Sequence, residues 1–116
     1  LRIQQVLYNL TDNAIKFSPE NSEIEIACTE HRNRMEISVS DSGIGIPDED
    51  LSRIFDRFFK GDRSRGQDKM GAGLGLAIAR EVMLAHGESL EATQRTEGGS
   101  RFVFTLPKAD EKNLRH

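Results

Sequence analysis

The sequence has little cysteine, little proline and few aromatic residues: its 116 residues include one cysteine, three prolines, one tyrosine and no tryptophan. A single cysteine excludes an internal disulfide framework. Cys28 falls in a segment of alternating residues, so we expect it to be a small core residue in a reducing compartment. No apolar run approaches the length of a membrane span. Because Leu1 already stands within an amphipathic pattern, we expect a piece of a longer protein.

The charge is small and mixed in sign. A formal net charge of -3 at pH 7, with acidic and basic residues interleaved, disfavours general nucleic-acid binding. A chain of this length forms one domain and buries about two thirds of its unfolded surface, which is enough for a real core.

Residues 3–17 have the periodicity of an amphipathic helix. Apolar residues recur on one face, at Ile3, Leu7, Leu10 and Ala14. At about 100 degrees per residue, a second narrow arc carries Asn9, Asn13 and Lys16. Asp12 projects away from both arcs by the same count. Because asparagine is a poor helix former, this polar face predicts a binding site, with an ordinary solvated face as the alternative.

Asp41 follows a pair of predicted antiparallel strands. Alternating apolar residues indicate strands over 23–30 and 35–39. Asp41 is in phase with the apolar residues of the second strand, so its carboxylate should point toward the covered side and needs a donor there. Gly43 and Gly45 permit close approach of a purine, whose amino group would satisfy Asp41 while Ile46 packs on the ring. In the alternative, Asp41 caps its own backbone turn.

Three glycines at alternate positions, Gly71, Gly73 and Gly75, run into an apolar helix that should end near Gly87, a suitable C′ residue. Glycines before a helix N-terminus are typical of anion binding, and phosphate is the natural ligand; tight helix packing is the alternative. Neither the dinucleotide fingerprint nor the P-loop motif is complete here. The charged residues 61–73 suit a lid that closes over phosphates, with a plain solvated loop as the alternative.

Three further segments complete the expected elements: a short helix over 51–58 and a hairpin of strands over 90–96 and 101–106. In the second strand of the hairpin, Phe102 and Phe104 share one face, whereas Val103 and Thr105 share the other. The sequence leaves open which of these faces meets a ligand.

Taken in order, these motifs resemble those of the catalytic ATP-binding domain of bacterial sensor histidine kinases, a family in the ATPase superfamily that includes gyrase and Hsp90. The resemblance covers nearly the whole chain. It implies an α/β (α+β) sandwich, the Bergerat-type fold, with a mixed, mainly antiparallel sheet and about three helices packed on one face. It also implies a catalytic domain over 1–107, which lacks the family's N-terminal strand, and a polar tail over 108–116.

The resemblance also implies a role for each motif. The segment from Asn9 to Phe17 resembles the N box, in which Asn13 would hold Mg2+ and Lys16 would contact the phosphates. Residues 41–47 resemble the G1 box, in which Asp41 would accept the adenine amino group. Residues 54–60 and 71–76 resemble the F box and the G2 box.

The nucleotide-binding residues that the resemblance implies come from all of these motifs and from the last strand: Asn9, Asn13, Lys16, Phe17, Asp41, Gly43, Gly45, Ile46, Phe59, Lys60, Gly71, Gly73, Leu74, Gly75, Leu76 and Thr105. The residues with an implied catalytic role are Asn9, Lys16 and Lys60.

The activity that the resemblance implies is transfer of the γ-phosphate of Mg-ATP to a histidine on a separate dimerisation domain of the same protein, from which a response regulator takes it. None of His31, His86 and His116 has the sequence context of that histidine, so this chain alone should not autophosphorylate. A GHKL-type ATPase is one alternative, disfavoured because Asn9 replaces the water-activating glutamate, and a non-enzymatic nucleotide sensor is another. The implied location is cytoplasmic, without direct membrane contact, within a membrane-anchored sensor.

Overall fold

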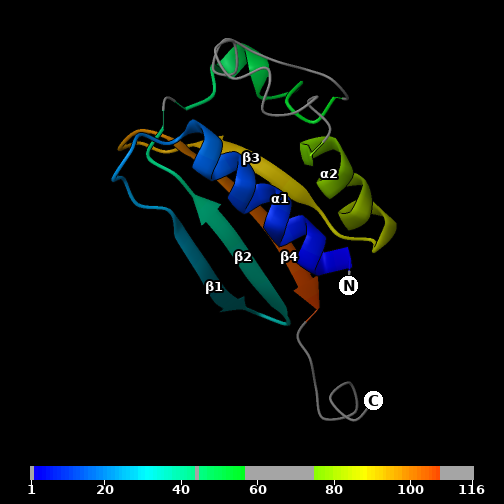
Figure 1. Ribbon diagram of the computed structural model, residues 1–116. Helices are drawn as coiled ribbons and strands as arrows, with labels where there is room; N and C mark the ends of the chain where they lie inside the picture. Colours follow the sequence, from blue (N-terminus) through cyan, green and yellow to red (C-terminus); the bar gives the residue numbers. More distant parts are fainter. Residues whose placement is uncertain (1, 44, 57–74, 108–116) are drawn as a thin grey trace.

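The computed structural model describes residues 2–43, 45–56 and 75–107. Two helices, α1 (Arg2–Phe17) and α2 (Gly75–Ala85), lie side by side over one face of a sheet (Figure 1). The four strands are β1 (Glu25–His31), β2 (Arg34–Ser40), β3 (Leu90–Gln94) and β4 (Ser100–Pro107).

The sheet has the strand order β1-β2-β4-β3, and each neighbouring pair is antiparallel. This α+β sandwich confirms the predicted fold class. The described part of the sheet contains no parallel pair, so the expected mixed character is absent from it. About three helices were expected, and the described residues form two α-helices and a short 3-10 helix, η1 (Asp48–Asp50).

The core lies between the two helices and the sheet. α1 buries the predicted Leu10 and Ala14 together with Val6, which confirms the helical period read from the sequence. The sheet contributes Phe102 and Phe104, each only 1% exposed. Burial of side chains of this size stabilises the fold by roughly 1.5 to 3 kcal/mol each. The apolar face of β4 is therefore the one that meets the helices.

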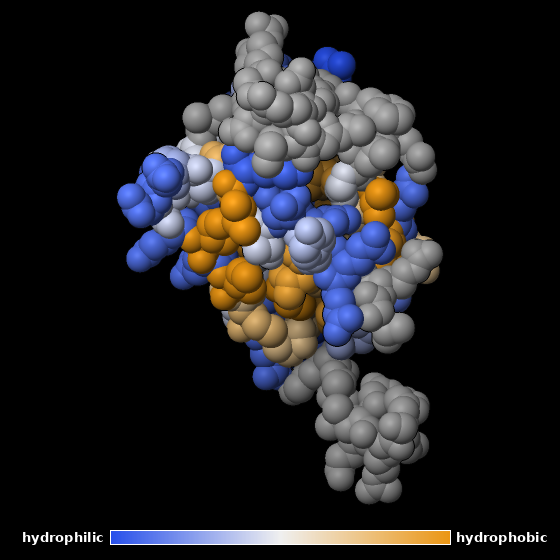
Figure 2. Space-filling model, viewed as in Figure 1, coloured by the Kyte–Doolittle hydropathy of each residue, from blue (hydrophilic) through white to orange (hydrophobic). Residues whose placement is uncertain are grey.

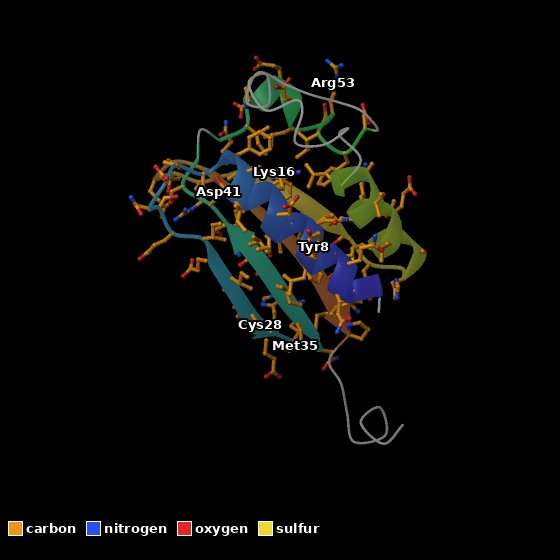
Figure 3. The ribbon with its side chains drawn as sticks, viewed as in Figure 1. Tyr8, Lys16, Cys28, Met35, Asp41 and Arg53 are labelled. Atoms are coloured by element: carbon orange, nitrogen blue, oxygen red, sulfur yellow. The ribbon has the colours of Figure 1, made fainter. Side chains whose placement is uncertain are left out.

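β1 lies at the edge of the sheet, outside the cover of the helices. α1 contacts β2 and α2 contacts β3, whereas every residue of β1 except Ala27 is exposed. The prediction that Cys28 is a core residue is therefore wrong: its thiol is exposed, and Ile26 is 52% exposed. Figure 2 shows apolar side chains at the surface beside α1, and Figure 3 places Cys28 and Met35 toward the hairpin end of β1 and β2.

The predicted helix over 51–58 is replaced, in its described part, by tighter turns. The backbone N–H groups of Leu51, Arg53 and Asp56 each donate to the carbonyl three residues earlier, as in a 3-10 helix. The apolar edge of this segment is as expected, because Phe55 packs edge-to-face on Phe102 with ring centroids 6.2 Å apart. The segment is thus fixed to the core by its side chains.

α2 ends as the sequence predicts. Gly87 has φ +73 and its N–H donates to the carbonyl of Leu84, while the N–H of Glu88 donates to the carbonyl of Met83. These two bonds form a Schellman motif with glycine at C′. The Nδ1 atom of His86 lies 2.8 Å from the carbonyl oxygen of Val82, so this histidine also has a structural role at the helix end.

Candidate nucleotide-binding site

Asn9 connects the polar face of α1 to the beginning of α2. Its Nδ2 atom donates to the carbonyl oxygen of Gly75 over 3.1 Å. Gly75 is the first residue of α2, where the sequence predicts an anion site, and Leu76 after it is partly buried against the core. The side-chain amide therefore holds the helix start beside the face of α1 that carries Asn13 and Lys16.

Asn13 carries a buried polar atom for which the described residues offer no partner. Its Nδ2 atom is buried and forms no hydrogen bond within the described part of the chain, although it lies on the face predicted to bind a ligand. Rotation of the carboxamide exchanges its nitrogen and oxygen, so the same position can present an oxygen. Mg2+ takes oxygen ligands and is commonly held by one or two protein groups together with phosphates and water. The residues present therefore fit the metal that the sequence implies.

Lys16 forms an ion pair within α1. Its Nζ atom lies 3.0 Å from Oδ2 of Asp12, one turn earlier in the helix. Asp12 projects outside the polar arc by the helical count, but an aspartate at this spacing reaches the lysine, so it contacts one member of the arc. Figure 3 shows Lys16 and Asp41 at the same end of the sheet. The ion pair is partly exposed, with side-chain exposures of 23% for Lys16 and 40% for Asp12.

Asp41 is completely buried, which confirms that its side chain points to the covered side of the sheet. Its Oδ1 atom accepts from the backbone N–H of Gly43 at 2.9 Å and from that of Ser100 at 3.3 Å. Its Oδ2 atom accepts from the hydroxyl of Ser100 at 2.8 Å. The first bond is the self-capping turn that the sequence left open. Two carboxylate oxygens offer about four acceptor positions, so, counting donors from the described residues alone, one position remains for a further donor.

Two close backbone approaches fix the position of Asp41. A Cβ atom on Gly43 would collide with the carbonyl oxygen of Phe17, so this turn packs directly on the end of α1. A Cβ atom on Gly99 would collide with the carbonyl oxygen of Asp41, and Gly99 also has φ +89. The first of these contacts places the turn that holds the buried carboxylate against the C-terminal end of α1, at the end of the sheet where Figure 3 also labels Lys16.

Gly45 and Ile46 continue the turn into the core. Gly45 has φ +81, and an added Cβ atom would lie 2.6 Å from Oε1 of Gln94. Ile46 is only 1% exposed and belongs to the hydrophobic core. Their proposed contacts with a base remain predictions.

Thr105 is not brought together with the other predicted residues. It pairs with Glu36 across the sheet and donates its hydroxyl to Oε1 of Glu88 at 3.1 Å. It lies on the opposite face of β4 from Phe104, five positions from the strand end that meets Asp41. Ser100 occupies that end, and sequence reasoning missed it. Its shared parity with the two buried phenylalanines is the signal that identifies its face.

Five predicted residues lie outside the described part of the chain: Phe59, Lys60, Gly71, Gly73 and Leu74. The proposed lid over 61–73 lies outside it as well. Their roles stay predictions.

Arg95 contacts the backbone at the beginning of the same turn. Its Nη1 atom donates to the carbonyl oxygen of Asp41 at 2.7 Å, and its Nη2 atom lies 3.6 Å from Oε2 of Glu97. The pKa of Glu97 is lowered by a hydrogen bond from its own backbone, by the hydroxyl of Thr96 and by the charge of Arg95. All three favour the ionised carboxylate.

Comparison with known proteins shows the family of the chain, and the match extends over nearly all of its residues. A model of the histidine kinase-, DNA gyrase B- and HSP90-like ATPases matches residues 1–110, and the chain belongs to this family. Among curated relatives, it is 42% identical over 113 residues to the sensor histidine kinase WalK of Bacillus subtilis, covering 96% of this chain and 18% of the relative. It is 43% identical over 106 residues to the sensor protein KdpD of Clostridium acetobutylicum, covering 91% of this chain and 12% of that protein. The chain thus spans less than a fifth of these relatives.

Solved structures agree with the family. The mycobacterial sensor histidine kinase MprB superimposes with a TM-score of 0.84 at 30% identity, covering 91% of this chain and 72% of that one. Full-length ShkA in complex with AMPPNP gives a TM-score of 0.77 at 31% identity, covering 93% of this chain and 22% of that one. The histidine kinase ThkA in complex with the response regulator TrrA gives a TM-score of 0.75 at 36% sequence identity, covering 96% of this chain and 30% of that one. The fold is that of histidine kinase catalytic domains.

Proposed function

We propose that this chain binds Mg-ATP and donates the γ-phosphate to a histidine on a separate dimerisation domain of its parent protein. A response regulator would then take the phosphate in a two-component signalling system. The proposal includes the catalytic domain over 1–107 and a cytoplasmic location in a membrane-anchored sensor. In the described residues, no helix is long and apolar enough to cross a membrane.

The observation that carries the proposal is that the turn holding the buried Asp41 carboxylate packs on the C-terminal end of α1, the helix whose polar face carries Asn13 and Lys16. The contact between Gly43 and the end of α1 fixes this arrangement. Adenine offers an exocyclic amino donor that suits the remaining acceptor position of Asp41, and Lys16 offers a positive charge for phosphate. The bound ATP analogue in the ShkA structure supports a nucleotide as the ligand.

Each proposed role uses the chemistry of a residue on the α1 face. Asn13 would hold Mg2+, which neutralises phosphate charge when bound. Lys16 would orient the phosphates, and Asn9 would keep the start of α2 beside them through its bond to Gly75. Positioning and charge neutralisation dominate catalysis of phosphoryl transfer, so this set suits a kinase.

The same face argues against efficient hydrolysis of ATP. A hydrolase needs a base that takes a proton from water, and a carboxamide at Asn9 has no useful proton affinity. The amide also already donates to Gly75. The ThkA complex with a response regulator further supports the signalling role.

Incubation of the chain with ATP labelled at the γ-phosphate, with and without the parent's dimerisation domain, tests the proposal. We expect label on a histidine of the added domain, no label on this chain alone, and loss of transfer in Asn13→Ala. Release of phosphate at one rate with or without the acceptor would instead identify a hydrolase. ATP binding with neither reaction would identify a nucleotide sensor.

A further inference from the structure

The end of the β3–β4 hairpin contacts the Asp41 turn through two cross-strand partners. Gln94, the last residue of β3, pairs with Ser100, the first residue of β4. Ser100 binds the carboxylate of Asp41 at the beginning of the turn. Gln94 binds the other end of the same turn, where Ile46 enters the core.

The Gln94 carboxamide uses both of its polar atoms on this segment. Its Oε1 atom accepts from the backbone N–H of Ile46 at 3.1 Å, and its Nε2 atom lies 3.4 Å from Oδ1 of Asp48. Asp48 begins the 3-10 helix that follows the turn. One side chain therefore connects the sheet to two successive points of the chain beyond Gly45.

The close approach of Gln94 depends on the backbone of Gly45. An added Cβ atom there would lie 2.6 Å from Oε1 of Gln94. The positive φ of Gly45 and the absence of its side chain thus let the carboxamide reach the backbone of Ile46. The glycine that the sequence assigns to approach of a base also admits this protein group.

We propose that Gln94 is a positioning residue for the adenine site, because it holds residues 45–48 in the shape that places Asp41 and Ile46 around the base. This inference rests on the proposed function of the Asp41 site. A carboxamide is required because the position needs an acceptor for an N–H and a donor for a carboxylate at the same time. Neither a carboxylate nor an apolar side chain supplies both.

The test measures ADP affinity without Mg2+, so that the metal does not contribute, together with hydrogen exchange at the Ile46 amide. Gln94→Ala removes both contacts. We expect it to weaken ADP about three- to tenfold, the equivalent of about one net hydrogen bond, and to accelerate exchange at Ile46. Thr93→Ala is the matched control, because Thr93 is exposed and points to the opposite face of β3.

Introduction of a negative charge at position 94 distinguishes positioning from general stability. Gln94→Glu keeps an acceptor for Ile46 but sets a second carboxylate against Asp48, so ADP binding should weaken. Asp48→Asn alone should weaken ADP binding less than Gln94→Glu does, because an amide oxygen still accepts from Gln94. The double variant should recover affinity, since the new amide at position 48 donates to the new carboxylate.

Each other outcome overturns the inference. Wild-type ADP affinity in Gln94→Ala, unchanged exchange at Ile46, or an equal loss in Thr93→Ala would each remove Gln94 from this role. Failure of Asp48→Asn to rescue Gln94→Glu would do the same. If wild type itself binds no ADP, the proposed function of the site fails, and the inference fails with it.

Discussion

Asp41→Asn is the substitution that separates binding from folding at this site. It keeps the size of the side chain and one oxygen, which can still accept from the N–H groups of Gly43 and Ser100. The new amide replaces the oxygen that accepts from the Ser100 hydroxyl, and that hydroxyl can rotate to accept instead. The cost to folding is therefore limited to the weakening of charge-assisted bonds, about 1 kcal/mol.

The cost to nucleotide binding is larger. In the proposed complex, the remaining acceptor position of the wild-type Asp41 would face a donor on the base. In the variant an amide N–H takes part of that space, so a donor meets a donor within a buried site. Leaving a buried polar group without its partner costs about 1 to 3 kcal/mol, which corresponds to a loss in affinity of about five- to 150-fold.

Calorimetric titration with ADP measures this loss, and thermal unfolding of the same samples reports folding. Ser100→Ala is the matched control, because it removes one partner of the carboxylate without placing a donor in the adenine site. Equal ADP affinity in Asp41→Asn and wild type would refute the assignment of Asp41 to the pocket. A loss of affinity that merely follows the loss of stability in both variants would refute it as well.

Asn13→Ala should abolish the Mg2+ dependence of ATP binding in titrations with and without the metal, and an unchanged dependence would place the metal elsewhere. Gly99→Ala should lower the free energy of unfolding by more than about 3 kcal/mol in denaturant titration, because it combines strain at positive φ with a collision against the Asp41 carbonyl; a near-normal midpoint would contradict this contact. In an NMR titration, Glu97 should have a lower midpoint in the folded protein than in the unfolded chain; its small contribution to stability is present above its unfolded-state pKa and is lost as pH falls through the folded-state value. The Cys28 thiol should react with a thiol reagent in the native protein, and protection until unfolding would contradict its exposure.

The polar face of α1 could be predicted from the sequence because it depends only on the helical repeat. Asn9, Asn13 and Lys16 share an arc in any straight helix, and the buried Leu10 fixes which arc faces the core. The burial of Asp41 was predictable for the same kind of reason, since it follows the alternation of β2.

Ser100, and not the predicted Thr105, is the residue of β4 that meets Asp41, and this shows where local periodicity is insufficient. Alternation along β4 correctly separates Phe102 and Phe104 from Thr105. Which end of β4 meets Asp41, however, depends on the register in which Val39 pairs with Phe102. That register is set by contacts between segments more than 60 positions apart, which no short window of sequence contains.

Cys28 was misjudged for a related reason. The alternation of β1 identifies two faces, and its Ile26 and Cys28 do share the side on which β2 carries Val39. Alternation does not say how far the helices extend across the sheet. Because β1 is the edge strand and α1 contacts β2, its apolar face extends past the helical cover. Burial at an edge is a property of the packed layers rather than of the strand.

The two roles that the sequence offered for Asp41, base recognition and capping of its own turn, support one another. A free carboxylate on a mobile turn would have to be desolvated and oriented when a ligand arrives. Here Gly43 and Ser100 already hold both oxygens within a fully buried environment. The free-energy cost of desolvating and orienting the carboxylate is therefore incurred during folding and not during binding. A ligand that supplies one donor finds its acceptor already in place. Self-capping is thus a reason to expect recognition at Asp41 rather than an alternative to it.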